Sequence, residues 1–268
     1  MKKRLAIACV ALGLIMDSVV LAQDVPVEVP AAIKALEAKA AAGNTEAKKD
    51  LGLKYMLGEG VKPNPVVAQK WLTEAGNEGN AAAQISLGLM FEEARGVEKN
   101  IAEAIKWYEK AAKQGYPSAQ SRLGYIYKKG EGVKQDYALA AKWLQEAASR
   151  GEVYAQANLA DMYENGVGVK QDYSLAATWY SAAASQSHPM AQKRLARLYA
   201  NGQGVDKSPV LAYMWYTIAG VWTMDEAMGE DDPRAALTPL MSQEEIEKAE
   251  MLATDWWVEH FAKHQAVP

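Results

Sequence analysis

The chain of 268 residues contains a single cysteine, Cys9, which lies inside an apolar run near the N-terminus. That run does not end in the Leu-Ala-Gly-Cys type of sequence that precedes a lipid anchor. The remainder of the chain has no thiol, which excludes disulfides, thiol nucleophiles and thiolate metal sites there. We therefore expect the folded protein to depend on packing alone.

Long apolar segments are also absent after residue 22, where none approaches the roughly 20 residues that a membrane-spanning helix needs. The N-terminus has a different pattern. Lys2, Lys3 and Arg4 precede a short apolar run, and Val20 and Ala22 place small residues at the positions of a cleavage site. This is typical of a secretory signal peptide. We predict that residues 1–22 are removed, that the mature protein begins near Gln23, and that it is periplasmic or secreted without membrane insertion.

Positive charge is not in excess. Without residues 1–22 the chain has 26 Lys and Arg against 32 Asp and Glu, a net charge of −6. This balance argues against nucleic acid as a partner, because the phosphate backbone is bound mainly by Lys and Arg. Half of all residues are apolar and 23% are charged, as in a folded globular protein.

Signatures of catalysis and cofactor binding are missing as well. The sequence has no Gly-x-Ser-x-Gly or Ser-x-x-Lys motif, and no glycine-rich phosphate loop, since no strand is predicted. His260 and His264 are four residues apart on a predicted helix, which is the spacing of a two-histidine metal site. The alternative is a partly exposed pair at the end of a capping helix, and no glutamate stands where a zincin needs it. The acidic residues 225–232 lack the alternation of a calcium loop. We expect no enzymatic activity, no cofactor and no metal.

What the chain has instead is an internal repeat. One tryptophan recurs every 36 residues without insertion or deletion, at Trp71, Trp107, Trp143, Trp179 and Trp215. The five units begin at Gly43, Gly79, Gly115, Gly151 and Ser187 and occupy residues 43–222. A fixed period of this length is typical of a solenoid, in which each unit buries its apolar face against its neighbours.

The third unit shows the structure expected of each. Ala119, Leu123 and Tyr127 are spaced by four and form one face of a first helix, and the small residue Gly124 permits a close helix approach. A turn with Gly130 and Gly132 follows. The second helix is expected to begin after the N-cap residue, which is Asn64, Asn100, Asp136, Asp172 or Ser208 in the five units. Proline suits the first helical position, and Pro65, Pro117, Pro189 and Pro209 stand there. The Trp column is assigned to packing in the core, with a ligand-stacking ladder as the alternative.

The two ends depart from the repeat. Residues 23–42 are interpreted as a linker and a capping helix that begins near Pro30. Residues 223–268 are interpreted as an acidic, irregular connector followed by a C-terminal capping helix, which Ser242 and Glu245 open as a capping box. Trp256 and Trp257 on that helix are adjacent, so one of them is expected to be exposed. The predicted fold is all-α, a right-handed α/α solenoid of five 36-residue helix-turn-helix repeats with N- and C-terminal capping helices.

The unit resembles the Sel-1-like repeat, a relative of the tetratricopeptide repeat. The family pattern is matched by Ala119, Leu123-Gly124, Tyr127, Gly130-x-Gly132-Val133, Ala140, Trp143 and Ala147-Ala148. The resemblance implies an adaptor that binds partner proteins. One branch of the family, the cysteine-rich secreted repeat proteins of Helicobacter, implies an alternative, a cell-envelope enzyme or binder acting on β-lactams or peptidoglycan. The paired cysteines of that branch are absent here.

By the tetratricopeptide analogy, first helices line the concave side, and binding residues should vary between otherwise similar repeats. The candidate contacts for a protein or peptide partner are Arg122, Tyr125, Lys129, Tyr154, Asn158, Asp161, Arg194 and Arg197. Glu92 and Glu93 of the second unit, together with Lys128 and Glu164, are also expected to be exposed. From the second unit to the fifth, the charge along the groove then alternates acidic, basic, acidic and basic. Such alternation suits a partner of patterned charge. The alternative is that these residues form ion pairs between repeats. The oligomeric state is not indicated by the sequence.

Overall fold

The computed structural model describes residues 30–223 and 232–265, with side chains described up to Gly220 and again from Asp232 to His260. Within these ranges all regular structure is helical. The helices are α1 (Ala31–Ala41), α2 (Thr45–Leu57), α3 (Pro65–Asn77), α4 (Ala81–Glu92), α5 (Ile101–Lys113), α6 (Pro117–Lys129), α7 (Tyr137–Ser149), α8 (Val153–Asn165), α9 (Tyr173–Ala184), α10 (Pro189–Asn201), α11 (Pro209–Thr223) and α12 (Gln243–Gln265), with a 3₁₀ turn at Thr238–Leu240. The predicted signal peptide at residues 1–22 and the acidic residues 224–231 lie outside the described residues.

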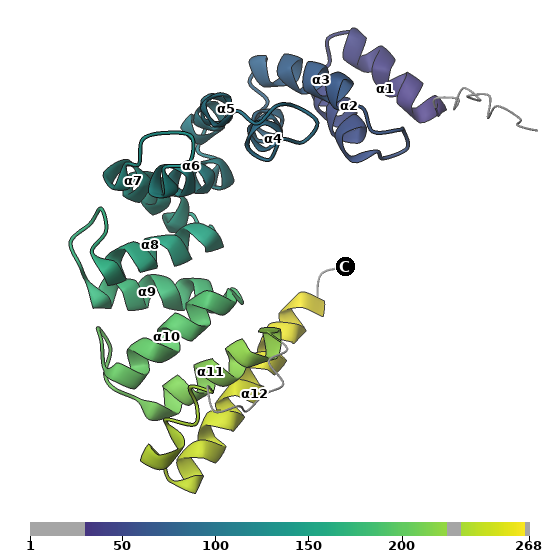
Figure 1. The fold of residues 1–268 in the computed structure, drawn as a ribbon. Helices are drawn as coiled ribbons and strands as arrows, with labels where there is room; N and C mark the ends of the chain where they lie inside the picture. The colour runs from purple at the N-terminus through teal and green to yellow at the C-terminus, as the bar shows by residue number, and fades with distance from the viewer. Residues whose placement is uncertain (1–29, 224–231, 266–268) are drawn as a thin grey trace, which may run out of the picture.

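Five helix pairs stack in sequence order into a curved array, with α1 against the first pair and α12 against the last (Figure 1). Each pair joins a first helix (α2, α4, α6, α8 or α10) to a second helix (α3, α5, α7, α9 or α11). First helices of neighbouring repeats touch, as α2 does with α4 and α6 with α8. Figure 1 shows α6 on the inner side of the curve and α7 on the outer side. The predicted solenoid is confirmed, and no helix in the described part of the chain is both long and apolar enough to span a membrane.

The predicted helix boundaries are also confirmed. The Asp136 carboxylate accepts a hydrogen bond of 2.9 Å from the backbone N–H of Leu139, which caps α7. Side chains do the same at the other second helices, through Asn64, Asn100, Asp172 and Ser208. The prolines begin α3, α6, α10 and α11 as expected. Gly130, at φ 71°, ends α6 in the left-handed conformation that residues other than glycine rarely adopt.

The core differs from the prediction at the tryptophans. Trp107 and Trp215 are buried, but Trp71, Trp143 and Trp179 are only half-buried. The large side chain that is fully buried in each of the first four second helices is the next residue, Leu72, Tyr108, Leu144 or Tyr180. The assignment of the Trp column to the core was therefore wrong in part, because the helix turns the following residue more directly toward its first helix.

The small residue of the first helix meets that same buried side chain. A Cβ placed on Gly124 would lie 2.5 Å from Leu144 Cγ, and one on Gly52 would lie 2.6 Å from Leu72 Cγ. Neither distance leaves room for a methyl group. The predicted close approach of the two helices is thus confirmed, and it occurs at the position after the tryptophan.

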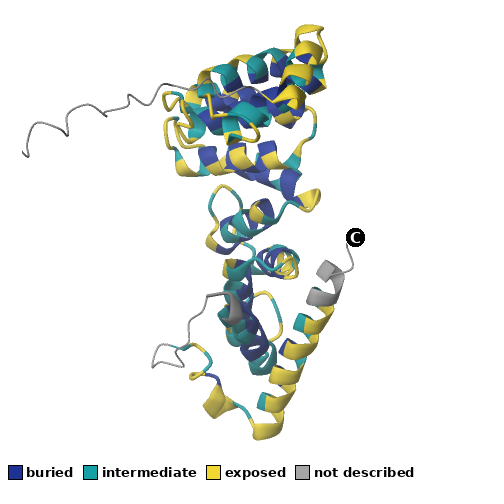
Figure 2. Ribbon diagram, turned by 90° about the vertical axis from the view of Figure 1, so that its right-hand side faces the viewer, coloured by how far each residue is buried: buried dark blue, intermediate teal, exposed yellow. Residues whose placement is uncertain are grey.

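Buried glutamines connect one repeat to the next. Gln84 donates its side-chain N–H to the carbonyl of Gly76 at 2.8 Å, eight residues earlier in the preceding second helix. Gln120, Gln156 and Gln192 repeat this bond at 3.2, 3.3 and 3.1 Å. Because each glutamine is buried, the bond is shielded from water and fixes the stacking offset between repeats. Figure 2 shows the buried residues gathered between the stacked helices.

The C-terminal helix covers the last repeat. Its predicted capping box is present, since Ser242 N–H donates to Glu245 at 2.8 Å and Glu245 N–H donates to Ser242 Oγ at 3.2 Å. Trp256 and Trp257 are both half-buried and pack against the core of the last repeat, so the expectation that one is exposed was wrong. His260 Nε2 lies 2.5 Å from Ser187 Oγ, which fastens α12 to the turn before α10.

Candidate partner-binding surface

The eight candidate residues all lie on first helices. Arg122, Tyr125 and Lys129 are on α6, Tyr154, Asn158 and Asp161 are on α8, and Arg194 and Arg197 are on α10. We call the outward-facing side chains of α4, α6, α8 and α10 the concave surface. The chain therefore brings the predicted residues onto one side of the array, in three consecutive repeats.

A set of charged residues on this side is less exposed than the sequence analysis expected. Glu92, Lys128 and Glu164 stand at equivalent positions of successive repeats, and their side chains are 13%, 17% and 5% exposed. Each extends toward the next first helix. Counting Lys128 and Glu164 among exposed groove residues was wrong, because the following repeat covers them.

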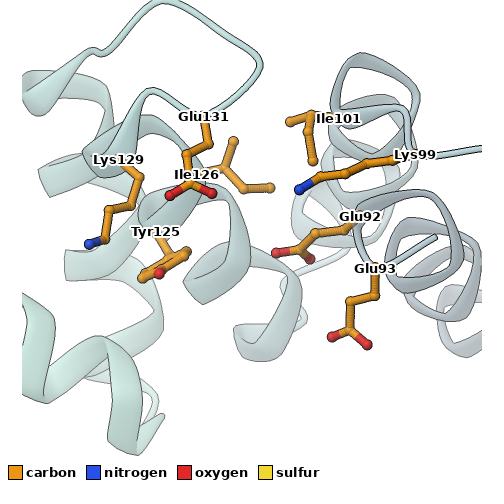
Figure 3. Close-up of a pocket in the computed structure, with 8 residues that line it drawn as sticks. All are labelled: Glu92, Glu93, Lys99, Ile101, Tyr125, Ile126, Lys129 and Glu131. Carbon is orange, nitrogen blue, oxygen red and sulfur yellow. The ribbon is translucent and has the colours of Figure 1, made fainter. Parts of the chain in front are cut away.

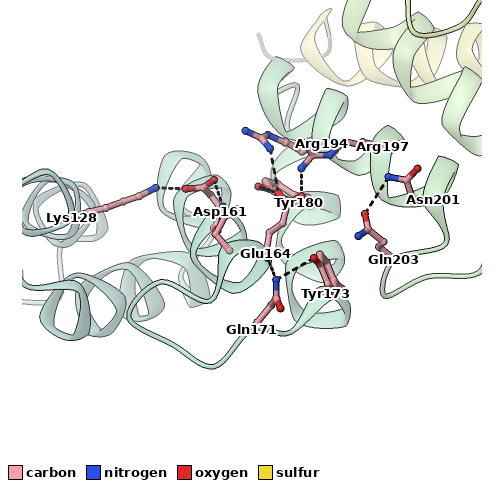
Figure 4. A network of polar contacts seen from close by, with 11 residues as sticks. Lys128, Asp161, Glu164, Gln171, Tyr173, Tyr180, Arg194, Arg197, Asn201 and Gln203 are labelled. Carbon is pink, nitrogen blue, oxygen red and sulfur yellow. Dashed lines mark hydrogen bonds and ion pairs between the residues drawn. The ribbon is translucent and has the colours of Figure 1, made fainter. Parts of the chain in front are cut away.

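Glu164 has the most partners. Its carboxylate lies 3.6 Å from Arg194 Nη1, and it also accepts a hydrogen bond from Arg197. Tyr180 donates its hydroxyl to the same carboxylate at 2.8 Å (Figure 4). Burial raises the pKa of the Tyr180 phenol and the Glu164 charge raises it further, so the phenol remains protonated and donates.

The two preceding repeats make related contacts. Lys128 Nζ lies 2.6 Å from Asp161 Oδ2 and 3.1 Å from Asn158 Oδ1. Glu92 lies 3.6 Å from an Arg122 Nη atom and accepts the Tyr108 hydroxyl at 2.6 Å. The Lys128–Asp161 and Glu92–Arg122 ion pairs each join a first helix to the first helix of the next repeat.

The alternation of charge along the concave surface is therefore also a series of contacts between repeats. Five of the eight candidate residues take part in these contacts, namely Arg122, Asn158, Asp161, Arg194 and Arg197. For these five residues the geometry matches the alternative given above, in which charged side chains hold neighbouring repeats together.

The other three candidates have more freedom to meet a partner. Tyr125 is 39% exposed, and the Lys129 ammonium lies 5.7 Å from the centre of its ring. Tyr154 is 66% exposed and meets the ring of His188 edge-on at 5.5 Å. Exposed tyrosines of this kind are typical of binding surfaces, since they offer a large apolar ring and a polar tip at a low entropic cost.

A pocket of about 280 Å³ adjoins Tyr125 and Lys129 (Figure 3). It lies between the second and third repeats, and it is lined by Glu92, Glu93, Lys99, Ile101, Tyr125, Ile126, Lys129 and Glu131. Lys99 and Glu131 come from the turns, and neither has an ion-pair partner among the described residues. The pocket therefore combines an apolar wall with charges of both signs, which suits a side chain of a peptide.

Lys99 and Glu131 are not among the contact residues predicted from the sequence, because those candidates were all taken from first helices. The signal was present in the turns. The positions equivalent to Glu131 hold Glu59, Arg95, Val167 and Gln203, so this turn position varies between repeats as much as the candidate helix positions do.

Histidines do not converge with other ligands in the described residues, where no group of three His, Cys, Asp or Glu side chains could hold a metal ion. The side chain of His264 lies outside the described residues, so the predicted pair cannot be placed. His188 has a structural contact, because its Nδ1 accepts the Ala191 N–H at 3.2 Å and caps α10. Burial lowers the pKa of His188, which favours the neutral ring that can accept this bond.

Comparison with known proteins agrees with this architecture. The Sel1 repeat model matches residues 45–80, 81–116, 117–152, 153–188 and 189–220, and each match starts two residues later than the unit predicted above. A Sel1 repeat protein from Oxalobacter formigenes is 27% identical with a TM-score of 0.62, and the match covers 81% of this chain and 96% of that one.

A second solved structure is a protective antigen present in uropathogenic Escherichia coli strains, which displays an SLR fold. It is 26% identical with a TM-score of 0.55, and the match covers 88% of this chain but 59% of that one, less than two thirds of its length. A search of curated proteins finds no match. Since the repeat model covers well over half of its residues, the chain belongs to the Sel1 repeat family.

Proposed function

We propose that this protein is an exported scaffold that binds a protein or peptide on its concave surface. Sel1 repeat proteins are in general scaffolds for protein–protein interaction. The observation that supports a specific surface is the pocket beside Tyr125, where Lys99 and Glu131 have no ion-pair partner among the described residues. Lys128 and Glu164 on the concave surface already pair with the next repeat, so charges without an ion-pair partner beside an exposed tyrosine mark a place where a partner gains contacts.

This proposal is tested by measuring how much partner is captured by a variant in which Tyr125 and Lys129 are substituted. Arg194 and Arg197 are less suitable, because their loss leaves the buried Glu164 carboxylate with fewer partners and destabilises the fold. We expect the double variant Tyr125→Ser/Lys129→Glu to lose most of the captured partner while its urea midpoint stays near that of the parent.

The matched control is Tyr137→Ser, since Tyr137 is 37% exposed but lies on a second helix. It should capture as much partner as the parent. Equal loss in both variants, or no loss in either, would show that the concave surface is not the binding surface.

Export is tested separately by the mass of the protein purified from its own cells. The proposal predicts a chain that begins near Gln23 and is recovered outside the cytoplasm. A full-length chain in the cytoplasm would contradict export without affecting the binding proposal.

A hydrolase acting on β-lactams or peptidoglycan gains no support from this pocket. Its lining contains no serine, threonine, cysteine or histidine that could attack a carbonyl. We expect the purified protein to leave a chromogenic cephalosporin intact, and turnover would contradict the scaffold proposal.

A further inference from the structure

The residue that follows each tryptophan correlates with the residue that faces it on the first helix of the same repeat. Where this residue is leucine, as in Leu72 and Leu144, the facing position of the first helix holds Met56 or Lys128. Where it is tyrosine, as in Tyr108 and Tyr180, that position holds a glutamate. This glutamate accepts the tyrosine hydroxyl and pairs with an arginine in the next repeat.

The fifth repeat breaks this relation. It has the tyrosine, Tyr216, but the facing position holds Ala200. The Tyr216 hydroxyl forms no hydrogen bond with another described residue. A phenol in a half-buried setting thus has no carboxylate where the second and fourth repeats provide one.

The local backbone is the same in the fourth and fifth repeats, so Ala200 and Glu164 occupy equivalent places in the structure. Helices α8 and α10 span equivalent residues 36 apart. The turn that follows is closed by Asp172 N–H to the Tyr163 carbonyl at 3.0 Å in one case, and by Ser208 N–H to the Tyr199 carbonyl at 2.9 Å in the other. Replacing the glutamate by alanine therefore removes an acidic side chain without moving the helices that would hold it.

Positive charge adjoins this place. Arg197 lies one helical turn before Ala200, on the same face of α10. Burial raises the pKa of the Tyr216 phenol, and the Arg197 guanidinium opposes that rise. Arg197 donates to Glu164 and forms no second hydrogen bond with a described residue, so its guanidinium has further N–H donors to offer.

We propose that Tyr216, Arg197 and the space left at Ala200 form a binding site for a carboxylate from an acidic segment of the protein partner. The proposal rests on the proposed function, since it assigns one chemical contact to the partner bound on the concave surface. The carboxylate accepts the Tyr216 hydroxyl and an Arg197 N–H, as the Glu164 carboxylate accepts from Tyr180 and Arg197. A charge-assisted hydrogen bond from arginine is stronger than a neutral one, and the planar guanidinium matches the geometry of a carboxylate.

The first test uses peptides as probes on the whole protein. Acetyl-Gly-Glu-Gly-amide, its Gln counterpart and inorganic phosphate are titrated while the NMR signals of the Tyr216 ring and the Arg197 Nε are followed. We expect the Glu peptide alone to shift both signals. Tyr216→Phe should weaken its binding about tenfold, and the matched variant Tyr180→Phe should not change it. Equal binding of the Glu and Gln peptides, or tighter binding of phosphate, would overturn the carboxylate assignment.

The second test supplies the carboxylate from within the chain. Ala200→Glu should abolish binding of the Glu peptide and raise the urea midpoint, and Tyr216→Phe in the same chain should cancel that rise. Met56→Glu is the matched control, because it faces Leu72, which has no hydroxyl, and it should lower the midpoint. If both glutamate variants lower the midpoint alike, the fifth repeat does not hold a carboxylate and the site is refuted.

Failure here differs from failure of the proposed function. A partner that is captured equally by the parent and by Ala200→Glu overturns this site alone. A parent protein that captures no partner overturns the proposed function, whatever the peptides do.

Discussion

Removing the Tyr180 hydroxyl should destabilise the protein much more than removing that of Tyr216. The two residues stand at equivalent positions 36 apart, and Tyr→Phe deletes one oxygen from each. Tyr180 donates to the Glu164 carboxylate at 2.8 Å in a buried setting, whereas Tyr216 has no such acceptor among the described residues. The comparison therefore isolates a single hydrogen bond.

The magnitude follows from the charge and burial of the acceptor. A hydrogen bond to an ionised group contributes about 1.5–3 kcal/mol to the free energy of unfolding. Glu164 is 5% exposed, so water cannot replace the lost donor, although Arg194 and Arg197 remain. We expect Tyr180→Phe to cost about 1.5–3 kcal/mol, and Tyr216→Phe to stay within about 0.5 kcal/mol of the parent.

Urea unfolding followed by circular dichroism at 222 nm measures both values. With m-values of about 2–3 kcal/mol per molar urea, Tyr180→Phe should lower the midpoint by about 0.5–1.5 M. Tyr108→Phe should behave like Tyr180→Phe, because Tyr108 donates to Glu92. Equal midpoints for the Tyr180 and Tyr216 variants would refute the pairing of tyrosine with glutamate as a stabilising unit.

Three further changes test the scaffold. Gly124→Ala should cost about 1–3 kcal/mol in urea unfolding, since its Cβ would lie 2.5 Å from Leu144, whereas Gly220→Ala, where no described atom lies within 4 Å of the added Cβ, should be neutral or stabilising. Asp136→Ala should lower the free energy of unfolding by about 1 kcal/mol because the α7 cap is lost, and Asp136→Asn should retain most of that stability in the same assay. Burial lowers the pKa of His188 below its unfolded value near 6.5, so the unfolded state binds the proton first and stability should fall as pH drops through about 6.5. His188→Asn, which matches the caps of α2 and α4, should flatten that part of the midpoint-against-pH curve, and an unchanged slope would show that the His188 cap is not responsible.

The fold could be predicted from the sequence because one spacing recurs without error. A 36-residue period with fixed glycines, prolines and N-cap residues determines where helices begin and end, and Asp136 and Pro117 stand where expected. The tryptophan column misled the assignment of the core, because a position that is uniform across the repeats is not always a buried one. The position after it holds leucine in two repeats and tyrosine in three, and that variation conceals its role.

The contacts between repeats could not be obtained in this way. Glu164 meets Arg194 and Arg197, which are 30 and 33 residues further along the chain. Which residues meet across these separations depends on how far one repeat is displaced relative to the next. The period of the sequence does not determine that displacement. Lys99 and Glu131 converge for the same reason, since they come from turns of different repeats.

A photo-crosslinking amino acid placed at Tyr125 tests the central claim most directly. Tyr125 on a first helix and Tyr137 on a second helix are equally exposed, so the same group can be placed at both with little effect on the fold. We expect irradiation in the native cell envelope to give one discrete crosslinked protein from position 125 and none from position 137. Crosslinks from position 137 alone, or the same products from both positions, would contradict recognition by the concave surface.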